Sequence, residues 1–248
     1  MSPSLIHAFL FYPVFVLIGL QNSFSAAAGG WYRLTFPASA LLLMLYSALV
    51  LRASNHRQRL IFLGGMLVCA FGENLCVHAF DLYHFAGALS SPYSIPPYVV
   101  VGHGYTIWTA LILSEELAVR FGARRTLSAL WAAIAVVTSA RVALNRDYPG
   151  IVWIAFFLLP YAISRRREDR LLLATTYLLA TGLELIGVGI KAWDWHASTY
   201  YYHWARFPFH SPPAAVGGFY ALAYWITLQL LRLVEAEGQS PPVARGSP

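Results

Sequence analysis

The sequence predicts an all-α fold: a polytopic helical bundle that is embedded in a membrane. Hydrophobic residues make up 58% of the 248 residues and charged residues only 11%, whereas a soluble domain carries about 25% charged residues. The mean hydropathy is +0.56, and apolar stretches long enough to cross a membrane recur along the chain. These observations exclude an ordinary soluble domain.

Eight spans are predicted, within a single transmembrane domain that covers residues 1–234. The spans are 5–25, 33–52, 59–80, 96–118, 126–145, 149–164, 170–191 and 212–233. The first lacks the basic residues that begin a secretion signal, so we expect it to be retained. The sixth is short, but residues 126–164 exceed one crossing of a core about 30 Å thick and suit two. Residues 235–248, rich in Pro, Gly and Ser, are expected to form a disordered cytoplasmic tail.

The placement of basic residues predicts the orientation of these spans. The loops after spans two, four and six, together with the tail, hold twelve of the 17 Lys and Arg residues, and the opposite side holds five. The twelve are Arg52, Arg57, Arg59, Arg120, Arg124, Arg125, Arg165, Arg166, Arg167, Arg170, Arg232 and Arg245. Positive residues concentrate in cytoplasmic loops, so we expect both termini in the cytoplasm, with the protein in a bacterial inner membrane. The basic charge then reports topology, and no nucleic-acid partner is expected.

Two segments of the chain resemble each other. Residues 73–85 (ENLCVHAFDLYHF), followed by a loop and PPYVVVGHGYTIW, correspond to residues 184–196 (ELIGVGIKAWDWH), followed by a loop and PPAAVGGFYALAYW. Four spans separate the copies, and an even number predicts a parallel repeat with halves of about 1–120 and 121–234. Such a repeat places Glu73 and Glu184 at similar depth, facing one central cavity. It also places Phe219 opposite His103.

Ionisable residues within spans are costly and are functional candidates by default. Glu73 and Glu184 are the candidate acids, because a dry pocket keeps a glutamic acid protonated and able to donate a proton. His78 and His103 are candidates to relay protons, and Asn74 lies on the same helical face as His78. The alternative for the glutamates is a structural one, as neutral acids that bond neighbouring helices.

The outer loops add two further acids and many aromatic residues. Asp81 and Asp194 recur at the outer mouth of the predicted cavity and complete the set of candidate catalytic residues. The candidate substrate-binding residues are Asn74, Tyr83, Tyr105, Trp108, Trp193, Trp195 and Tyr220. Aromatic faces stabilise cations, although a membrane-interface belt of Trp and Tyr has the same composition.

No motif predicts a cofactor. The sequence contains no phosphate-binding loop, nucleophile elbow, C-x-x-C or H-E-x-x-H motif. Glu73, His78, His84 and His103 could form a metal site, but their spacing matches no ligand pattern. We therefore predict no metal and no cofactor.

The repeated segments resemble the carotenoid hydratase family of polytopic carotenoid-biosynthesis proteins. The resemblance rests on Glu73, Tyr83, Pro97 and the pair Trp193 and Trp195, and covers about a third of the chain. The run FGxYxY that is usual in the family is replaced here by HAFDLYHF. The resemblance implies cofactor-free addition of water to a terminal isoprenoid double bond. Integral-membrane terpene cyclases, which also protonate their substrate with a carboxylic acid, provide an analogy.

The sequence therefore predicts a membrane enzyme, a lyase or isomerase, that protonates an isoprenoid-like lipid to start hydration or cyclisation. Its expected partners are this hydrophobic substrate and the surrounding membrane lipids. Two alternatives remain open at this point. One is a metal-dependent lipid hydrolase or oxidase, and the other is a small transporter or lipid-binding protein without chemistry.

Overall fold

The all-α class is confirmed. The computed structural model describes residues 3–27, 32–85, 95, 97–195, 198–200, 206–208 and 212–238. Its helices are α1 (Pro3–Phe9), α2 (Phe11–Ala27), α3 (Tyr32–Ala53), α4 (His56–Asn74), the π-helix η1 (Leu75–Ala79), α5 (Pro97–Phe121), α6 (Ala123–Asn145), the 3₁₀ helix η2 (Pro149–Ile154), α7 (Ala155–Ile163), α8 (Arg167–Gly189) and α9 (Gly217–Gly238). Four short strands, β1 (Tyr83–Phe85), β2 (Trp193–Trp195), β3 (Ser198–Tyr200) and β4 (Arg206–Pro208), form two antiparallel pairs.

Each predicted span overlaps one helix or two consecutive helices, but α9 begins at Gly217, five residues after the predicted start of the eighth span. By length and composition, three helical segments of the described chain can cross a membrane: His56–Ala79, Ala123–Asn145 and Arg167–Gly189. The first predicted span is divided between α1 and α2 at Leu10. Pro13 accounts for the division, because proline lacks an N–H and its ring clashes with the carbonyl of the residue four positions earlier, Phe9.

The predicted tail begins too early. Residues 235–238, which we expected to be disordered, extend α9 to Gly238. The sequence Glu-Ala-Glu favours helix, and glycine is a common helix terminator. The remaining residues of the predicted tail, 239–248, lie outside the described residues.

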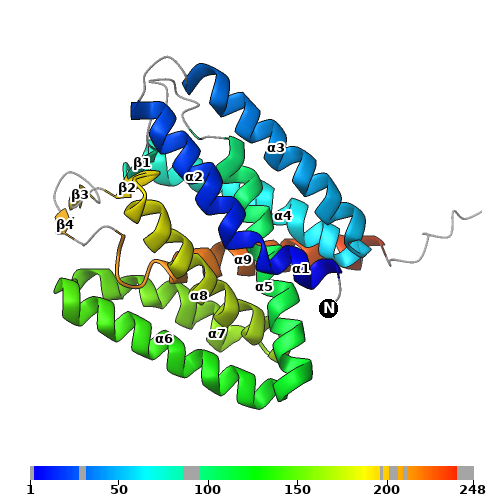
Figure 1. Ribbon diagram of the computed structural model, residues 1–248. Coiled ribbons are helices and arrows are strands. Elements are labelled where there is room, and N and C mark those ends of the chain that lie inside the picture. The colour runs from blue at the N-terminus through cyan, green and yellow to red at the C-terminus, as the bar shows by residue number, and fades with distance from the viewer. Residues whose placement is uncertain are drawn as a thin grey trace, which may run out of the picture.

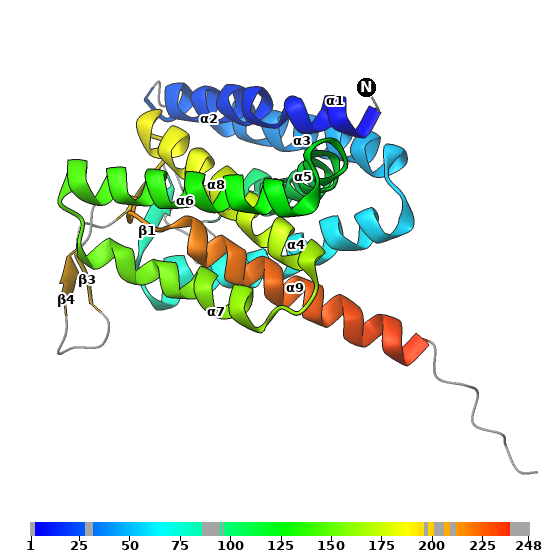
Figure 2. The same ribbon diagram turned by 90° about the horizontal axis from the view of Figure 1, so that it is seen from below.

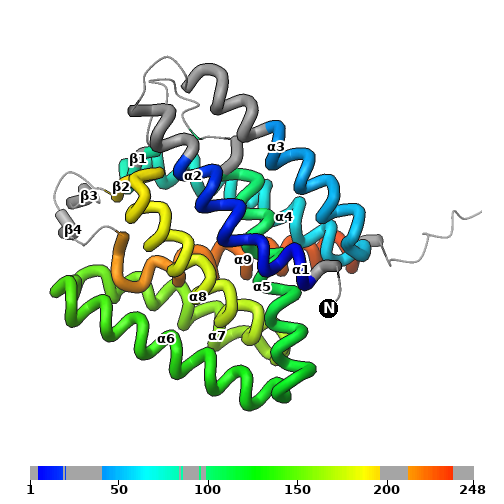
Figure 3. Tube along the Cα trace, in the orientation of Figure 1, coloured from blue at the N-terminus to red at the C-terminus, as the bar shows by residue number. Residues whose placement is uncertain are grey.

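Four helices surround the centre of the bundle. α4 packs on α5, α5 on α8, α8 on α9, and α9 on α4. α6 and α7 lie beside α8 and α9, whereas α1, α2 and α3 cover α5 on the other side (Figures 1 and 3). The core therefore contains the four helices that belong to the two similar segments of the sequence.

The two ends of the bundle differ in structure. The connections α3–α4, α5–α6 and α7–α8 lie at one end, which is also where α9 ends (Figures 1 and 2). β1 and β2 lie at the opposite end and pair in antiparallel register, with Tyr83 opposite Trp195, His84 opposite Asp194 and Phe85 opposite Trp193. The strands that follow α4–η1 and α8 thus meet directly above the core.

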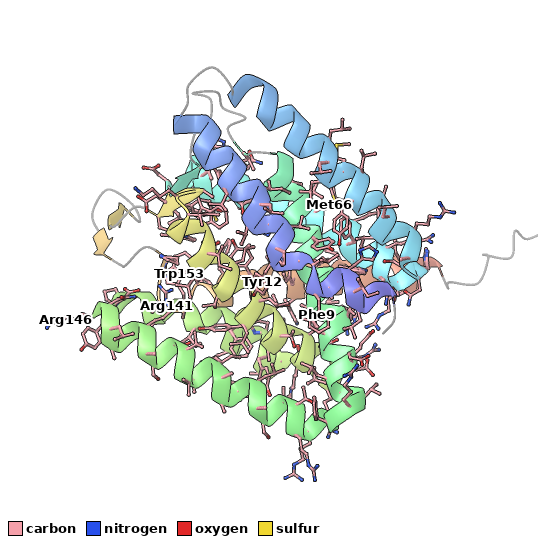
Figure 4. All side chains as sticks on the ribbon, viewed as in Figure 1. Phe9, Tyr12, Met66, Arg141, Arg146 and Trp153 are labelled. Atoms are coloured by element: carbon pink, nitrogen blue, oxygen red, sulfur yellow. The ribbon has the colours of Figure 1, made fainter. Side chains whose placement is uncertain are left out.

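The turn between α6 and η2 holds the start of α9 in place. The carboxylate of Asp147 accepts hydrogen bonds from the backbone N–H groups of Gly150 (2.9 Å) and Ala214 (2.7 Å). The guanidinium of the buried Arg141 donates from Nη2 to the carbonyl of Pro212 (2.5 Å). Arg141 lies with Trp153 near this end of the bundle (Figure 4). The contact gives Arg141 a structural role in ordering the segment before α9.

Candidate functional site

The first cluster of the candidate site is built around Glu73, near the end of α4. Its side chain is only 5% exposed. Oε2 accepts a hydrogen bond from the hydroxyl of Tyr83, and Oε1 lies 2.5 Å from Nε2 of His103 on α5. Burial, followed by the neighbouring Glu73 carboxylate, raises the pKa of Tyr83 well above its usual range. Tyr83 therefore stays protonated and able to donate to Glu73.

The second cluster is built around Glu184, on α8, which is 2% exposed. Oε2 accepts hydrogen bonds from the indole N–H groups of Trp193 and Trp195, each at 2.8 Å. Oε1 accepts from the hydroxyl of Tyr220 on α9. Three donors thus converge on one buried carboxyl group.

The two clusters are joined through an aromatic contact and a shared cavity. The rings of His103 and Tyr220 stack with centroids 5.2 Å apart. Glu73 and Glu184 line the same cavity of about 20 Å³, together with these two rings. A cavity needs roughly 10–15 Å³ to admit one water molecule. The site therefore has room for about one water beside two buried glutamates, and a larger ligand requires the walls to move.

The same kind of chain reversal positions both clusters. Asp81 and Lys191, each two residues before a strand, have left-handed backbone conformations, with φ of 50° and 58°. At the end of α8 the N–H of Ala192 bonds the carbonyl of Gly187 (2.8 Å), which is the usual closure after a left-handed residue. The reversal returns Trp193 towards Glu184, nine residues earlier.

In the first copy the reversal is one residue longer. Tyr83 contacts Glu73 across ten residues, and the added residue is taken up by the π-helix η1. The N–H of Phe80 bonds the carbonyl of Leu75, five residues earlier. Single π turns insert one residue into a helix and occur frequently at functional sites. η1 therefore lets the aromatic side chain reach its glutamate despite the different spacing.

Gly187 determines how closely Trp193 can approach α8. A Cβ at this position would lie 1.9 Å from Cζ2 of Trp193. We expect Gly187→Ala to push the indole away from Glu184 and to destabilise the fold by about 1–3 kcal/mol, as overpacking does. Thermal unfolding followed by tryptophan fluorescence measures the effect. Gly189→Ala is the matched control because a Cβ there has no neighbour within 4 Å, and equal unfolding temperatures for both variants would contradict the expectation.

The structure brings together seven of the predicted residues: Glu73, Glu184, His103, Tyr83, Trp193, Trp195 and Tyr220. It places Asn74 and His78 on the exposed face of α4 and η1. The amide of Asn74 donates to the carbonyl of Ala70 (2.7 Å), within its own helix. Both residues face away from Glu73 because helical side chains one or five positions apart point in different directions.

Other predicted residues also lie apart from the clusters. Asp81 and Asp194 are exposed in the reversals at the end of the bundle. Tyr105 and Trp108 are buried, but their polar atoms bond elsewhere: Tyr105 donates to the carbonyl of His7 (2.9 Å) and Trp108 to the hydroxyl of Ser54 (2.8 Å). These two aromatic residues anchor α5 to α1 and to the end of α3.

The comparison of the two segments placed Phe219 opposite His103, and this prediction was wrong. In the second cluster the position of His103 is taken by Tyr220. Tyr220 contacts Glu184 as His103 contacts Glu73, and Phe219 points towards an outer groove. Sequence reasoning missed Tyr224, whose hydroxyl donates to the carbonyl of His103 (3.0 Å). Tyr224 lies one turn after Tyr220 on α9, and this i, i+4 spacing was the available signal.

The metal-ligand set considered from the sequence is not assembled. His78 is exposed whereas Glu73 and His103 are buried, and the side chain of His84 lies outside the description. Within the described residues, no group of three His, Cys, Asp or Glu side chains is arranged to hold a metal ion. The clustered groups are instead suited to moving a proton and to facing a positive charge.

Comparisons with protein-family models, curated proteins and solved structures give no match for this chain.

Proposed function

We propose that the chain is an integral membrane enzyme that protonates an isoprenoid-like lipid and thereby starts its hydration or cyclisation. The supporting observation is that two buried glutamates from different helices line one cavity with aromatic walls, and that, among the described residues, Glu73 contacts a histidine and Glu184 does not. The two clusters therefore offer different chemistry within one site.

The membrane location is supported by the outer surface of the bundle. Leu67, Val136 and Leu144 are 74%, 67% and 82% exposed, on α4 and α6. Large apolar patches on a surface are characteristic of contact with lipid or another protein. Both helices belong to the three segments that are long and apolar enough to cross a membrane.

Eight crossings with both termini in the cytoplasm complete the proposed topology. The three arginine-rich connections gather at one end of the bundle, opposite β1 and β2 (Figure 2). We expect reporter fusions after Arg125 and after Ser211 to report opposite sides of the membrane. Alkaline phosphatase and green fluorescent protein fusions provide the measurement. The same side for both positions would contradict the eight-span topology.

A parallel internal repeat is part of the proposal. The left-handed residues Asp81 and Lys191, the antiparallel pairing of β1 with β2, and the shared cavity all support it. A pseudo-twofold axis between β1 and β2 would relate Glu73 to Glu184. The differences between the copies, above all His103 against Tyr220, then create an asymmetric site.

The proton donor in the proposal is Glu73. A protonated Glu73 can donate from Oε1 to Nε2 of a neutral His103 while Oε2 accepts from Tyr83, so both contacts of the carboxyl group remain satisfied. After each turnover, Nε2 of His103 can take up the proton that the reaction releases and pass it to Oε1 of Glu73. Indole N–H groups only donate, so Oε2 of Glu184 cannot share a proton with Trp193 or Trp195. Glu184 is therefore assigned the role of the carboxylate that faces the cation.

The reaction balances with water alone. The double bond of the substrate takes the proton of Glu73, and its electron pair forms the new C–H bond, which leaves a tertiary cation. In hydration, a water molecule donates a lone pair to the cation and its proton returns to the Glu73–His103 pair. In cyclisation, a second double bond supplies the electron pair, and the cyclised cation then loses a proton to the Glu73–His103 pair, which leaves an isomer of the substrate and regenerates the acid. The faces of Tyr220 and Trp193 stabilise the cation in either case.

Isotope incorporation tests the function. The purified protein in lipid nanodiscs is incubated with linear isoprenoids that end in a trisubstituted double bond, in deuterium oxide and in oxygen-labelled water. Hydration introduces both labels and cyclisation introduces deuterium only. Absence of both labels from every bound isoprenoid would contradict the proposal and favour lipid binding or transport.

A further inference from the structure

A second, larger hollow lies on the outside of the bundle, along the seam between α4–η1 and α9. Its volume is about 480 Å³, within the range of roughly 300–1,000 Å³ that is typical of small-molecule sites. It runs from Leu67 to Phe80 on one wall and from Phe219 to Leu230 on the other. All of its lining residues are apolar side chains, glycine or the thiol of Cys76. We call it the α4–α9 groove.

The dimensions of the groove suit one hydrocarbon chain. Residues 67–80 extend over about 20 Å at the rise of a helix, somewhat more than half of a hydrocarbon core about 30 Å thick. A groove of about 480 Å³ therefore has room for one extended hydrocarbon chain along this length.

The groove reaches the wall of the candidate site. Cys76 lines the groove, is 1% exposed and interacts with Glu73 and Tyr83. On the opposite wall, Phe219 lines the groove while the adjacent Tyr220 bonds Glu184, with the two rings 6.3 Å apart. One layer of side chains therefore separates the hydrocarbon groove from the cavity with the two glutamates.

The wall between groove and site contains a π-helical segment. Cys76 and Leu75 belong to the π-helix η1, and π turns occur frequently at functional sites. One turn earlier, Gly72 opens the floor of the groove, because a Cβ added there meets no atom within 4 Å. Replacement of Gly72 can therefore fill the groove without a clash with the protein.

From this continuity we infer that the α4–α9 groove holds the hydrocarbon chain of the isoprenoid substrate and delivers its reacting end past Cys76 to Glu73. The inference rests on the proposed function for the identity of the reacting end. The groove supplies what the 20 Å³ cavity lacks, namely a place for the rest of a long apolar molecule.

Gly72→Leu tests the inference by filling part of the groove with a side chain. The added side chain should raise KM for a long-chain isoprenoid by roughly tenfold, the worth of about two buried methylenes, and should raise KM for a short-chain analogue much less. Gly189→Leu is the control because that position also has open space but lies at the end of α8, away from the groove. Equal KM values for the two variants would overturn the inference.

Photolabelling separates this inference from the proposed function. An isoprenoid with a photoreactive group at its distal end should label the groove walls, such as Phe71 and Leu222, in both wild-type protein and Glu73→Gln. Labelling without turnover in the wild type would support the groove and defeat the proposed reaction. Turnover in the wild type, with labels on residues outside the groove, would support the proposed reaction and overturn the inference about the groove. Equal competition by a phospholipid with ordinary acyl chains would overturn the inference by identifying the groove as a site for membrane lipid.

Discussion

Glu73→Gln is expected to lower turnover by roughly 10²–10⁴-fold, the usual contribution of a positioned acid, while the protein stays folded. The amide N–H₂ can donate to Nε2 of His103, and the amide oxygen can accept from Tyr83, so both contacts of the carboxyl group are retained. Only the transferable proton is lost. Initial rates with the isoprenoid identified by isotope incorporation measure the effect.

The control for this prediction is Glu116→Gln, which removes a carboxylate from an ion pair with Arg120 on the outside of α5, away from both clusters. It should retain wild-type turnover and unfolding temperature. If Glu73→Gln and Glu184→Gln are both folded and keep nearly full activity, the buried glutamates serve only to bond helices together. That result would defeat the proposed chemistry.

Glu184→Leu is expected to destabilise the fold by about 3 kcal/mol or more. The substitution leaves the donors of Trp193, Trp195 and Tyr220 without their acceptor in a buried site, and each unsatisfied buried donor costs about 1–3 kcal/mol. Thermal unfolding in detergent, followed by tryptophan fluorescence, provides the measurement. An unfolding temperature equal to that of the wild type would show that the three hydrogen bonds do not hold α8, β2 and α9 together.

Glu184→Gln separates the structural role of this residue from its chemical role. Its amide oxygen can accept from both indoles and its N–H₂ can donate to the Tyr220 oxygen, so we expect most of the stability to be restored. Because the negative charge is absent, turnover should remain low if Glu184 faces the cation. Stability and activity that recover together would assign Glu184 to structure alone.

The local sequence was enough to identify the two glutamates as candidates. It was not enough to identify which side chains surround each of them. Glu73 and Glu184 stand out because a carboxyl group inside an apolar run is costly. Asn74 and His78 share that run, but α4 is apolar on several faces, so periodicity gives no indication of which face points inward. The partner of Glu184 on α9 was missed by one residue because the alignment rests on the two Pro-Pro pairs, and α5 is helical from Pro97 whereas α9 begins only at Gly217.

The sequence by itself determined the helical class, the positions of the helices and the two buried acids. It did so because the length of an apolar run and the cost of an ionisable group within it are local properties. Only the tertiary structure decided which side chains contact each glutamate. Tyr83 and His103 contact Glu73. The hydrogen-bond donors to Glu184 are Trp193, Trp195 and Tyr220. Those partners depend on which helix faces pack together and on two left-handed turns at Asp81 and Lys191. The single cavity between the glutamates likewise exists only because α4, α5, α8 and α9 surround a common centre.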